Sequence, residues 1–109
     1  MEQLNEYIDN MVVRLQEEEK ALIASHRKDE ANLIKMKINV YGIAKTFMDV
    51  AKKLAKDGEE RVIFKEKVES LSETWQKIFE EAIAHNDVEK IVVEEAKREA
   101  LDDVRSRCN

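Results

Sequence analysis

The chain contains no proline and only two glycines among its 109 residues. Proline and glycine interrupt regular secondary structure more strongly than any other residues, so almost the whole chain is free to be helical. Apolar side chains recur at intervals of three and four residues nearly from end to end, which is the spacing of one face of an α-helix. The sequence therefore predicts an all-α protein, and its length fits a single domain over residues 1–109.

Four amphipathic segments carry this pattern, and the second is the most regular. Its apolar residues alternate steps of three and four without a gap: Leu33, Met36, Val40, Ile43, Phe47, Val50 and Leu54. The apolar arc covers about half of the helix surface, so we expect this helix to pack against at least two others. We expect the centre of the core at Val40, Phe47, Leu71 and Trp75. In the first segment Glu18 interrupts the stripe, and we expect its carboxylate to reach water along an apolar surface.

The clearest break between segments lies at Gly58. Three lysines precede it (Lys52, Lys53 and Lys56), and they suit the negative end of a helix dipole. Glu59 and Glu60 follow and suit the positive start of the next helix. The sequence therefore predicts Gly58 as the C′ residue that terminates one helix.

The breaks at Ser25–Glu30 and His85–Glu89 contain neither glycine nor proline. Asp29 and Asn86 are the expected N-caps there, and Glu89 completes a capping-box-like pair with Asn86. The apolar phase nevertheless runs through both breaks, so two architectures remain. One is an antiparallel up-down-up-down four-helix bundle. The other is a hairpin of two helices of about 50 residues, hinged at Gly58, that dimerises into a four-helix bundle; helices of that length are uncommon, which favours the first.

Composition excludes several classes of function. The net charge of −5 and the pI near 5.2 argue against nucleic-acid binding by the surface as a whole. No apolar run approaches the ~18 residues that a membrane span requires, and the acidic first residues do not resemble a signal peptide. Cys108 is the only cysteine, which suits a reducing compartment, so we expect a cytoplasmic protein with this thiol exposed and inert.

The sequence contains no recognisable catalytic or metal-binding motif. A nucleophile elbow, a glycine-rich phosphate loop and paired zinc-binding cysteines are all missing. Di-iron bundles use Glu-x-x-His, but the residues three positions before His26 and His85 are Ile23 and Ala82. We therefore expect no enzymatic activity, no cofactor and no bound metal.

The two polar turns form the predicted binding surface, because in an antiparallel bundle both lie at the end opposite Gly58. They gather hydrogen-bond donors and acceptors where the apolar stripes are interrupted. The predicted contact residues are His26, Arg27, Asp29, Glu30, Asn32, His85, Asn86 and Asp87. The alternative interpretation is that these residues only cap helices.

A second surface is the lysine-rich face of the segment that spans residues 30–57, which carries six lysines against three acidic residues. Its exposed lysines are Lys35, Lys45, Lys52, Lys53 and Lys56. Acidic neighbouring helices neutralise this face, or it docks an acidic partner.

The strings Arg27-Lys28-Asp29-Glu30-Ala31-Asn32 and His85-Asn86-Asp87-Val88-Glu89-Lys90 resemble those of small all-helical bacterial proteins of unknown function from Firmicutes. This resemblance implies a helical fold and supplies no site or mechanism. We therefore expect a non-catalytic helical bundle that binds another protein or a second copy of itself as a homodimer. The alternative is a bundle that binds a small ligand or metal at the end formed by His26 and His85.

Overall fold

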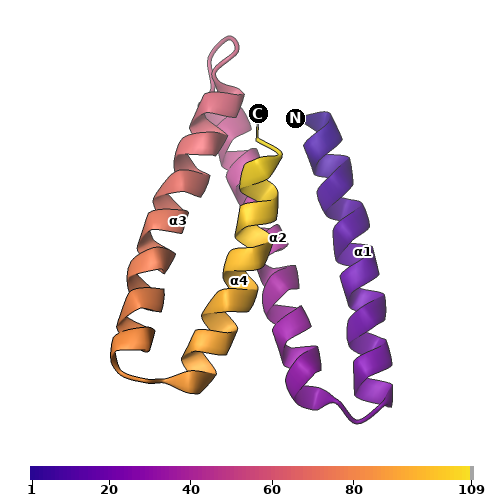
Figure 1. Ribbon diagram of the computed structural model, residues 1–109. Helices are drawn as coiled ribbons and strands as arrows, with labels where there is room; N and C mark the ends of the chain where they lie inside the picture. Colours follow the sequence, from indigo (N-terminus) through magenta and orange to yellow (C-terminus); the bar gives the residue numbers. More distant parts are fainter. Residues whose placement is uncertain (109) are drawn as a thin grey trace.

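The computed structural model describes residues 1–108, and these form four α-helices without a strand. The helices are α1 (Glu2–Ala24), α2 (Lys28–Leu54), α3 (Glu60–Ala84) and α4 (Val88–Ser106). Figure 1 shows successive helices running in opposite directions. The predicted all-α four-helix bundle is therefore confirmed. The alternative with two long helices is wrong, because helices end at Ala24 and Ala84.

The break between α1 and α2 is made by the backbone. His26 adopts a left-handed conformation with φ of 60°. Its N–H donates to the Ile23 carbonyl (3.0 Å), and the Arg27 N–H donates to the Leu22 carbonyl (2.9 Å). This Schellman arrangement satisfies carbonyls that the helix end would otherwise leave unpaired. The N-cap of α2 is Arg27, so the prediction of Asp29 as N-cap is wrong; Asp29 lies in the first turn, where its charge suits the helix dipole.

The break between α3 and α4 repeats this geometry. Asn86 is left-handed with φ of 54°, and it donates to the Ile83 carbonyl (3.1 Å) while Asp87 donates to the Ala82 carbonyl (3.0 Å). Asn86 is thus the C′ residue of α3, and its predicted role as N-cap is wrong. Asp87 caps α4 instead, because its side chain accepts a hydrogen bond from the Lys90 N–H (3.2 Å).

The loop at Gly58 separates α2 from α3, as predicted, but Gly58 is not a C′ residue. α2 ends at Leu54, and the backbone at Ala55 is already extended. Gly58 lies further along the loop with φ of 76°, and Glu60 begins α3. Glycine suits this position because side chains strongly disfavour left-handed backbone.

The core is built around α2, which packs against all three other helices, whereas α1 packs against α2 alone. α4 packs against both α2 and α3. The largest fully buried side chains are Ile8, Val40, Phe64, Val68 and Val104. Val40 and Trp75 are buried as predicted. The prediction was wrong for Phe47 and Leu71, which lie half-buried at the edge of the core.

The two hairpins share one burial pattern. The buried residues Leu4, Ile8 and Leu15 of α1 precede the buried Phe64, Val68 and Trp75 of α3 by 60 positions each. The same offset relates four buried residues of the second helices: Val40, Tyr41, Ala44 and Met48 correspond to Ala100, Leu101, Val104 and Cys108. The left-handed His26 and Asn86 are also 60 positions apart. The molecule thus consists of two similar αα-hairpins, and the second helix of one, α2, packs against both helices of the other.

Cys108 occupies the last position of this pattern, so its predicted exposure is wrong. The thiol is buried and donates to the Val104 carbonyl (3.3 Å). Burial raises the pKa of the Cys108 thiol, which favours its protonated form.

None of the four described helices combines the length and the hydropathy that crossing a bilayer requires.

The two glycines should respond to alanine in opposite directions. A Cβ at Gly42, which is exposed within α2, would meet no heavy atom within 4 Å. We expect Gly42→Ala to raise the free energy of unfolding by about 0.5–1 kcal/mol, because alanine favours the helix. We expect Gly58→Ala to lower it by about 1–2 kcal/mol through left-handed strain. Urea denaturation measures both. A loss of stability in Gly42→Ala would show that the outer face of α2 is covered in solution.

Candidate functional site

The two predicted polar turns lie at the same end of the bundle, as expected, but on opposite sides of it. Figure 1 shows the α1–α2 turn at the lower right and the α3–α4 turn at the lower left. All eight predicted contact residues are exposed: His26, Arg27, Asp29, Glu30, Asn32, His85, Asn86 and Asp87. The expected convergence of the two turns into one surface is therefore not observed.

The polar side chains of each turn interact within that turn. Arg27 pairs with Glu30, and Nδ1 of His85 lies 2.8 Å from the Glu81 carbonyl oxygen. Asp87 caps α4. Across residues 1–108, no group of three or more His, Cys, Asp and Glu side chains is arranged to hold a metal ion. The contacts at these turns are thus one local ion pair, one contact to a helix carbonyl and one helix cap.

A groove lies instead between α1 and α4. No Cα atom of α1 comes within 8 Å of a Cα atom of α4, so these helices stand further apart than packed neighbours do. The equivalent pair in the other half of the repeat, α3 and α2, is in contact. The bundle is therefore closed along α2 and α3 and open along α1 and α4.

The groove comprises two adjoining hollows of about 500 and 450 Å³, which share Lys37 and Glu99. The first is lined by Tyr7, Met11, Leu15, Lys37, Tyr41, Glu99, Ala100, Asp102 and Asp103. The second, which we call the lower hollow because it lies toward the α1–α2 turn, is lined by Glu18, Leu22, Arg27, Glu30, Leu33, Ile34, Lys37, Val92, Glu95, Ala96 and Glu99. Two of the predicted site residues, Arg27 and Glu30, thus border the groove.

The groove has an apolar floor and a predominantly acidic lining. Buried side chains form the floor: Leu15, Ile34, Ala96 and Ala100. Six acidic side chains line the groove: Glu18, Glu30, Glu95, Glu99, Asp102 and Asp103. Its two basic side chains are already paired, Lys37 with Glu99 (3.1 Å) and Arg27 with Glu30. Asp102 and Asp103 pair with Arg105 and Arg107 outside this lining, so the unpaired negative charge of the groove lies on Glu18 and Glu95.

Carboxylates from both α1 and α4 line the open side of the bundle. Glu18 of α1 occupies the position that Ile78 occupies in the repeat, so a carboxylate replaces an apolar side chain. Glu95 and Glu99 line the same hollow from α4. Closing the groove would bring these carboxylates together and remove them from water, which is unfavourable. Glu18 is exposed as predicted, and its interruption of the apolar stripe is the sequence signal for the groove.

At the upper end of the groove, Asp103 links α1, α2 and α4. Its Oδ2 accepts hydrogen bonds from the hydroxyls of Tyr7 (2.7 Å) and Tyr41 (2.6 Å). Its Oδ1 accepts one from Nε of Arg107 (3.1 Å), and that guanidinium stacks on the Tyr7 ring with Cζ 3.6 Å from the ring centroid. We call Tyr7, Tyr41, Asp103 and Arg107 the Asp103 latch. It joins the free side of α1 to α4 where the backbones are not in contact.

The latch holds a carboxylate in its ionised form. Burial by itself would raise the pKa of Asp103, but hydrogen bonds from Tyr41, Tyr7 and Arg107 outweigh it and lower the pKa. Burial raises the pKa of Tyr41, and the bond to Asp103 raises it further. Both phenols therefore remain protonated donors, and the carboxylate remains an ionised acceptor, at neutral pH.

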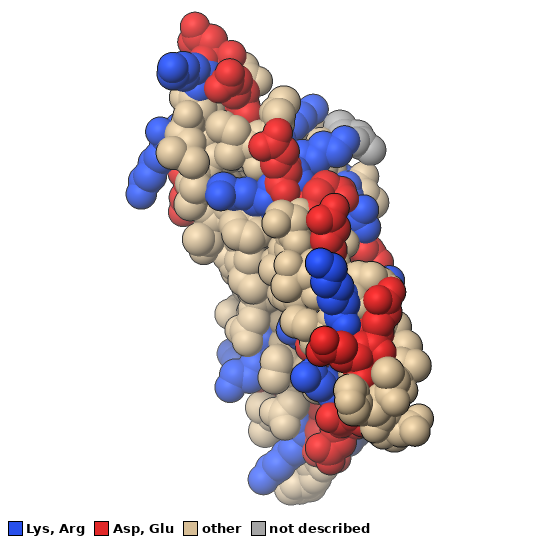
Figure 2. All heavy atoms as spheres, turned by 90° about the vertical axis from the view of Figure 1, so that its left-hand side faces the viewer, with Lys and Arg blue, Asp and Glu red and all other residues tan. Residues whose placement is uncertain are grey.

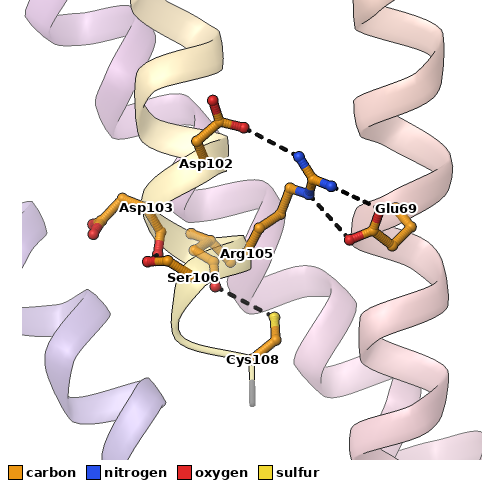
Figure 3. A network of polar contacts seen from close by, with 7 residues as sticks. Glu69, Asp102, Asp103, Arg105, Ser106 and Cys108 are labelled. Carbon is orange, nitrogen blue, oxygen red and sulfur yellow. Dashed lines mark hydrogen bonds and ion pairs between the residues drawn. The ribbon is translucent and has the colours of Figure 1, made fainter.

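The opposite side of α4 is closed by a separate network with α3. Arg105 donates from Nε and Nη2 to the two carboxylate oxygens of Glu69 (3.0 Å each) and from Nη1 to Asp102 (3.4 Å). Figure 3 shows this pair on one side of α4 and the Asp103 carboxylate turned toward the other. α4 is therefore tied to α3 by an ion pair and to α1 by the latch.

The surface beside α3 has a different charge distribution from the groove. Figure 2 shows acidic and basic side chains intermixed on this face. The unbalanced negative charge of the groove is not found on the face in Figure 2.

The lysine-rich face of α2 is partly neutralised by α1. Lys45 of α2 pairs with Asp9 of α1.

Glu94 is a buried acid that the sequence reasoning did not identify. Its side chain is 7% exposed, and its Oε1 accepts from Nζ of Lys97 (3.2 Å), which lies 4.4 Å from the centroid of the Trp75 ring. Its Oε2 has no hydrogen-bond partner. None of the groove hollows includes Glu94, so we assign it no part in the site.

The sequence reasoning also missed the Asp103 latch. The two tyrosines flank apolar stripes in different segments, and Asp103 lies in the least regular one. The sequence does place two tyrosine hydroxyls beside core positions, and a tyrosine hydroxyl that is buried needs a hydrogen-bond acceptor. The acceptor lies 62 and 96 positions away along the chain, so only the fold reveals it.

No family model, curated protein or solved structure matches this chain. The resemblance to small bacterial helical proteins is therefore left untested, and the site is interpreted from its geometry.

Removal of the Asp103 charge should destabilise the protein in a pH-dependent way. At pH 7 we expect Asp103→Asn to lower the free energy of unfolding by about 1–3 kcal/mol, because hydrogen bonds to an ionised acceptor are lost. The native pKa of Asp103 is lowered, so its stabilisation is present above the unfolded-state pKa of about 4 and is lost as the pH falls through the native value. The difference from wild type should therefore shrink at pH 3.

Urea denaturation at both pH values measures this difference. The control is Asp102→Asn, an exposed neighbour on the same helix, for which we expect a change below about 0.5 kcal/mol. A difference between wild type and Asp103→Asn that is equal at pH 7 and pH 3 would contradict an ionised Asp103.

Proposed function

We propose that this protein is a non-catalytic helical bundle that binds another protein through the groove between α1 and α4. The observation that carries the proposal is the separation of these helices, which leaves buried side chains as the floor of an open hollow. Bundles normally close such a seam, so an open one with an apolar floor suits a partner that completes the packing. The proposed setting is the cytoplasm, which the single cysteine favours, and a bacterial origin is what the resemblance implies.

The dimensions of the groove suit a helix as the bound element. On α1 its lining extends from Tyr7 to Leu22, which is about 22 Å at 1.5 Å per residue. This length corresponds to about four turns of a partner helix. Helix-in-groove recognition uses apolar side chains on successive turns to fill such a floor.

The chemistry of the groove supports binding rather than catalysis. Asp103 accepts three hydrogen bonds and has a lowered pKa, which makes it a weak base for proton transfer. The excess of carboxylates also disfavours a nucleic-acid partner, since phosphates would be repelled.

The proposed binding surface lies along the side of the bundle, whereas the sequence predicted it at the end formed by the two polar turns. Arg27 and Glu30 remain part of it, because they border the lower hollow. The turn that contains His85, Asn86 and Asp87 lies on the other side of the molecule and is not included.

A selection from an unbiased library tests this proposal. Helix-forming peptides of about 18 residues are selected by display against the protein, and their sites are mapped by the amide chemical shifts of the protein. We expect the shifts to concentrate on the groove. We expect Val92→Gln, which places a polar group in the groove, to weaken the selected peptides about tenfold.

The matched control is Val13→Gln. Val13 is similarly exposed but lies on α1 outside the groove lining, so we expect the affinity of the selected peptides to stay unchanged. Equal losses in both variants, or shifts concentrated away from the groove, would refute the proposed surface.

A further inference from the structure

We infer that the partner of the groove is a basic amphipathic helix that carries Lys or Arg on both sides of an apolar stripe. This inference rests on the proposed function and adds the chemistry of the bound element. It follows from the positions of unpaired acidic side chains and of the exposed apolar side chains beside them. It also follows because no helix of a second copy of this chain can present a basic face with an exposed apolar stripe.

The two edges of the lower hollow each carry an exposed carboxylate without a cation. Glu18 lines the hollow from α1 and Glu95 lines it from α4. Neither makes a hydrogen bond or an ion pair with the part of the chain that the structure describes. Glu99, beside Glu95, pairs with Lys37 yet stays 73% exposed. A helix lying between α1 and α4 would therefore meet carboxylates on both of its flanks, and cations on both flanks match them.

Between these carboxylates lies apolar surface that water reaches. Val92 is 42% exposed, and Leu22 and Leu33 are half-buried in the same hollow. Aliphatic side chains on successive turns of a partner helix would cover these three residues. Burial of this apolar area favours association. The groove thus selects an apolar stripe flanked by positive charge.

A second copy of this chain does not supply such a helix. Its most basic helix is α2, whose apolar stripe is buried in its own fold at Val40, Ala44 and Met48. Presenting that stripe to another molecule would require unfolding the helix that contacts all the others. The occupant we infer is therefore a different protein.

Two synthetic peptides test the inference directly. Both carry leucines at helical spacing, and they differ only in the flanking positions, which are lysine and arginine in one and glutamate in the other. We expect the basic peptide to bind, by fluorescence anisotropy, at least about tenfold more tightly than the acidic one. We also expect its affinity to fall as salt is raised, because the carboxylates are exposed. Equal affinity for the two peptides would overturn the inference.

A second experiment removes the two unpaired negative charges of the groove. We expect the double variant Glu18→Gln with Glu95→Gln to weaken the basic peptide about tenfold. The control, Glu66→Gln with Glu73→Gln, removes the same charge from exposed positions on α3, and we expect its affinity to match wild type. An equal loss in both double variants would mean that only the overall charge attracts the peptide, which would overturn the inference.

The outcomes separate this inference from the proposed function. If library-selected peptides occupy the groove but carry neutral or acidic flanks, the groove binds helices and the inferred chemistry is wrong. If the basic peptide binds and shifts amides on α3 instead of α1 and α4, both the surface and its chemistry are wrong. Binding of the basic peptide in the groove, with loss in the groove variant alone, supports both.

Discussion

The packing of α2 against every other helix is the interaction on which the rest of this structure depends. α2 is the most continuously amphipathic segment, and its wide apolar arc supplies contacts on several sides at once. α3 and α4 then also pack against each other, whereas α1 packs on α2 alone. A bundle organised around one central helix need not close into a ring, so a seam can remain open without loss of the shared core.

The two hairpins share a burial pattern but differ in how they pack against their neighbours. The two hairpins bury equivalent residues, yet α2 and α3 pack while α4 and α1 do not. Among the positions that differ, Glu18 stands where the other hairpin has Ile78, and Glu99 stands where it has Asn39. Carboxylates therefore line the open seam at positions where the closed seam has uncharged side chains, and the Asp103 latch links α1 to α4 beside them.

The sequence predicted the helices well because their boundaries depend on local rules. The apolar spacing, the polar turns and Gly58 predicted an all-α chain and favoured four helices, but two long helices remained an alternative because the apolar phase runs through both polar turns. The caps were predicted less well: both turns end in a left-handed residue, His26 and Asn86, whose role depends on carbonyls of the preceding helix. The groove could not be predicted from the sequence, because it depends on the distance between α1 and α4 in the folded protein. Only Glu18, as a break in an apolar stripe, indicated it.

The single-sided attachment of α1 has a consequence for local stability. Partial unfolding proceeds through the units that have the fewest tertiary contacts to lose. α1 can separate from α2 and break the latch while α2, α3 and α4 remain packed around Val40, Phe64, Val68 and Val104. Backbone amides of α1 should therefore exchange with solvent through a sub-global opening whose free energy lies below that of complete unfolding. A ligand that spans α1 and α4 would raise the free energy of this opening. Binding in the groove would therefore slow the hydrogen exchange of backbone amides along the whole of α1.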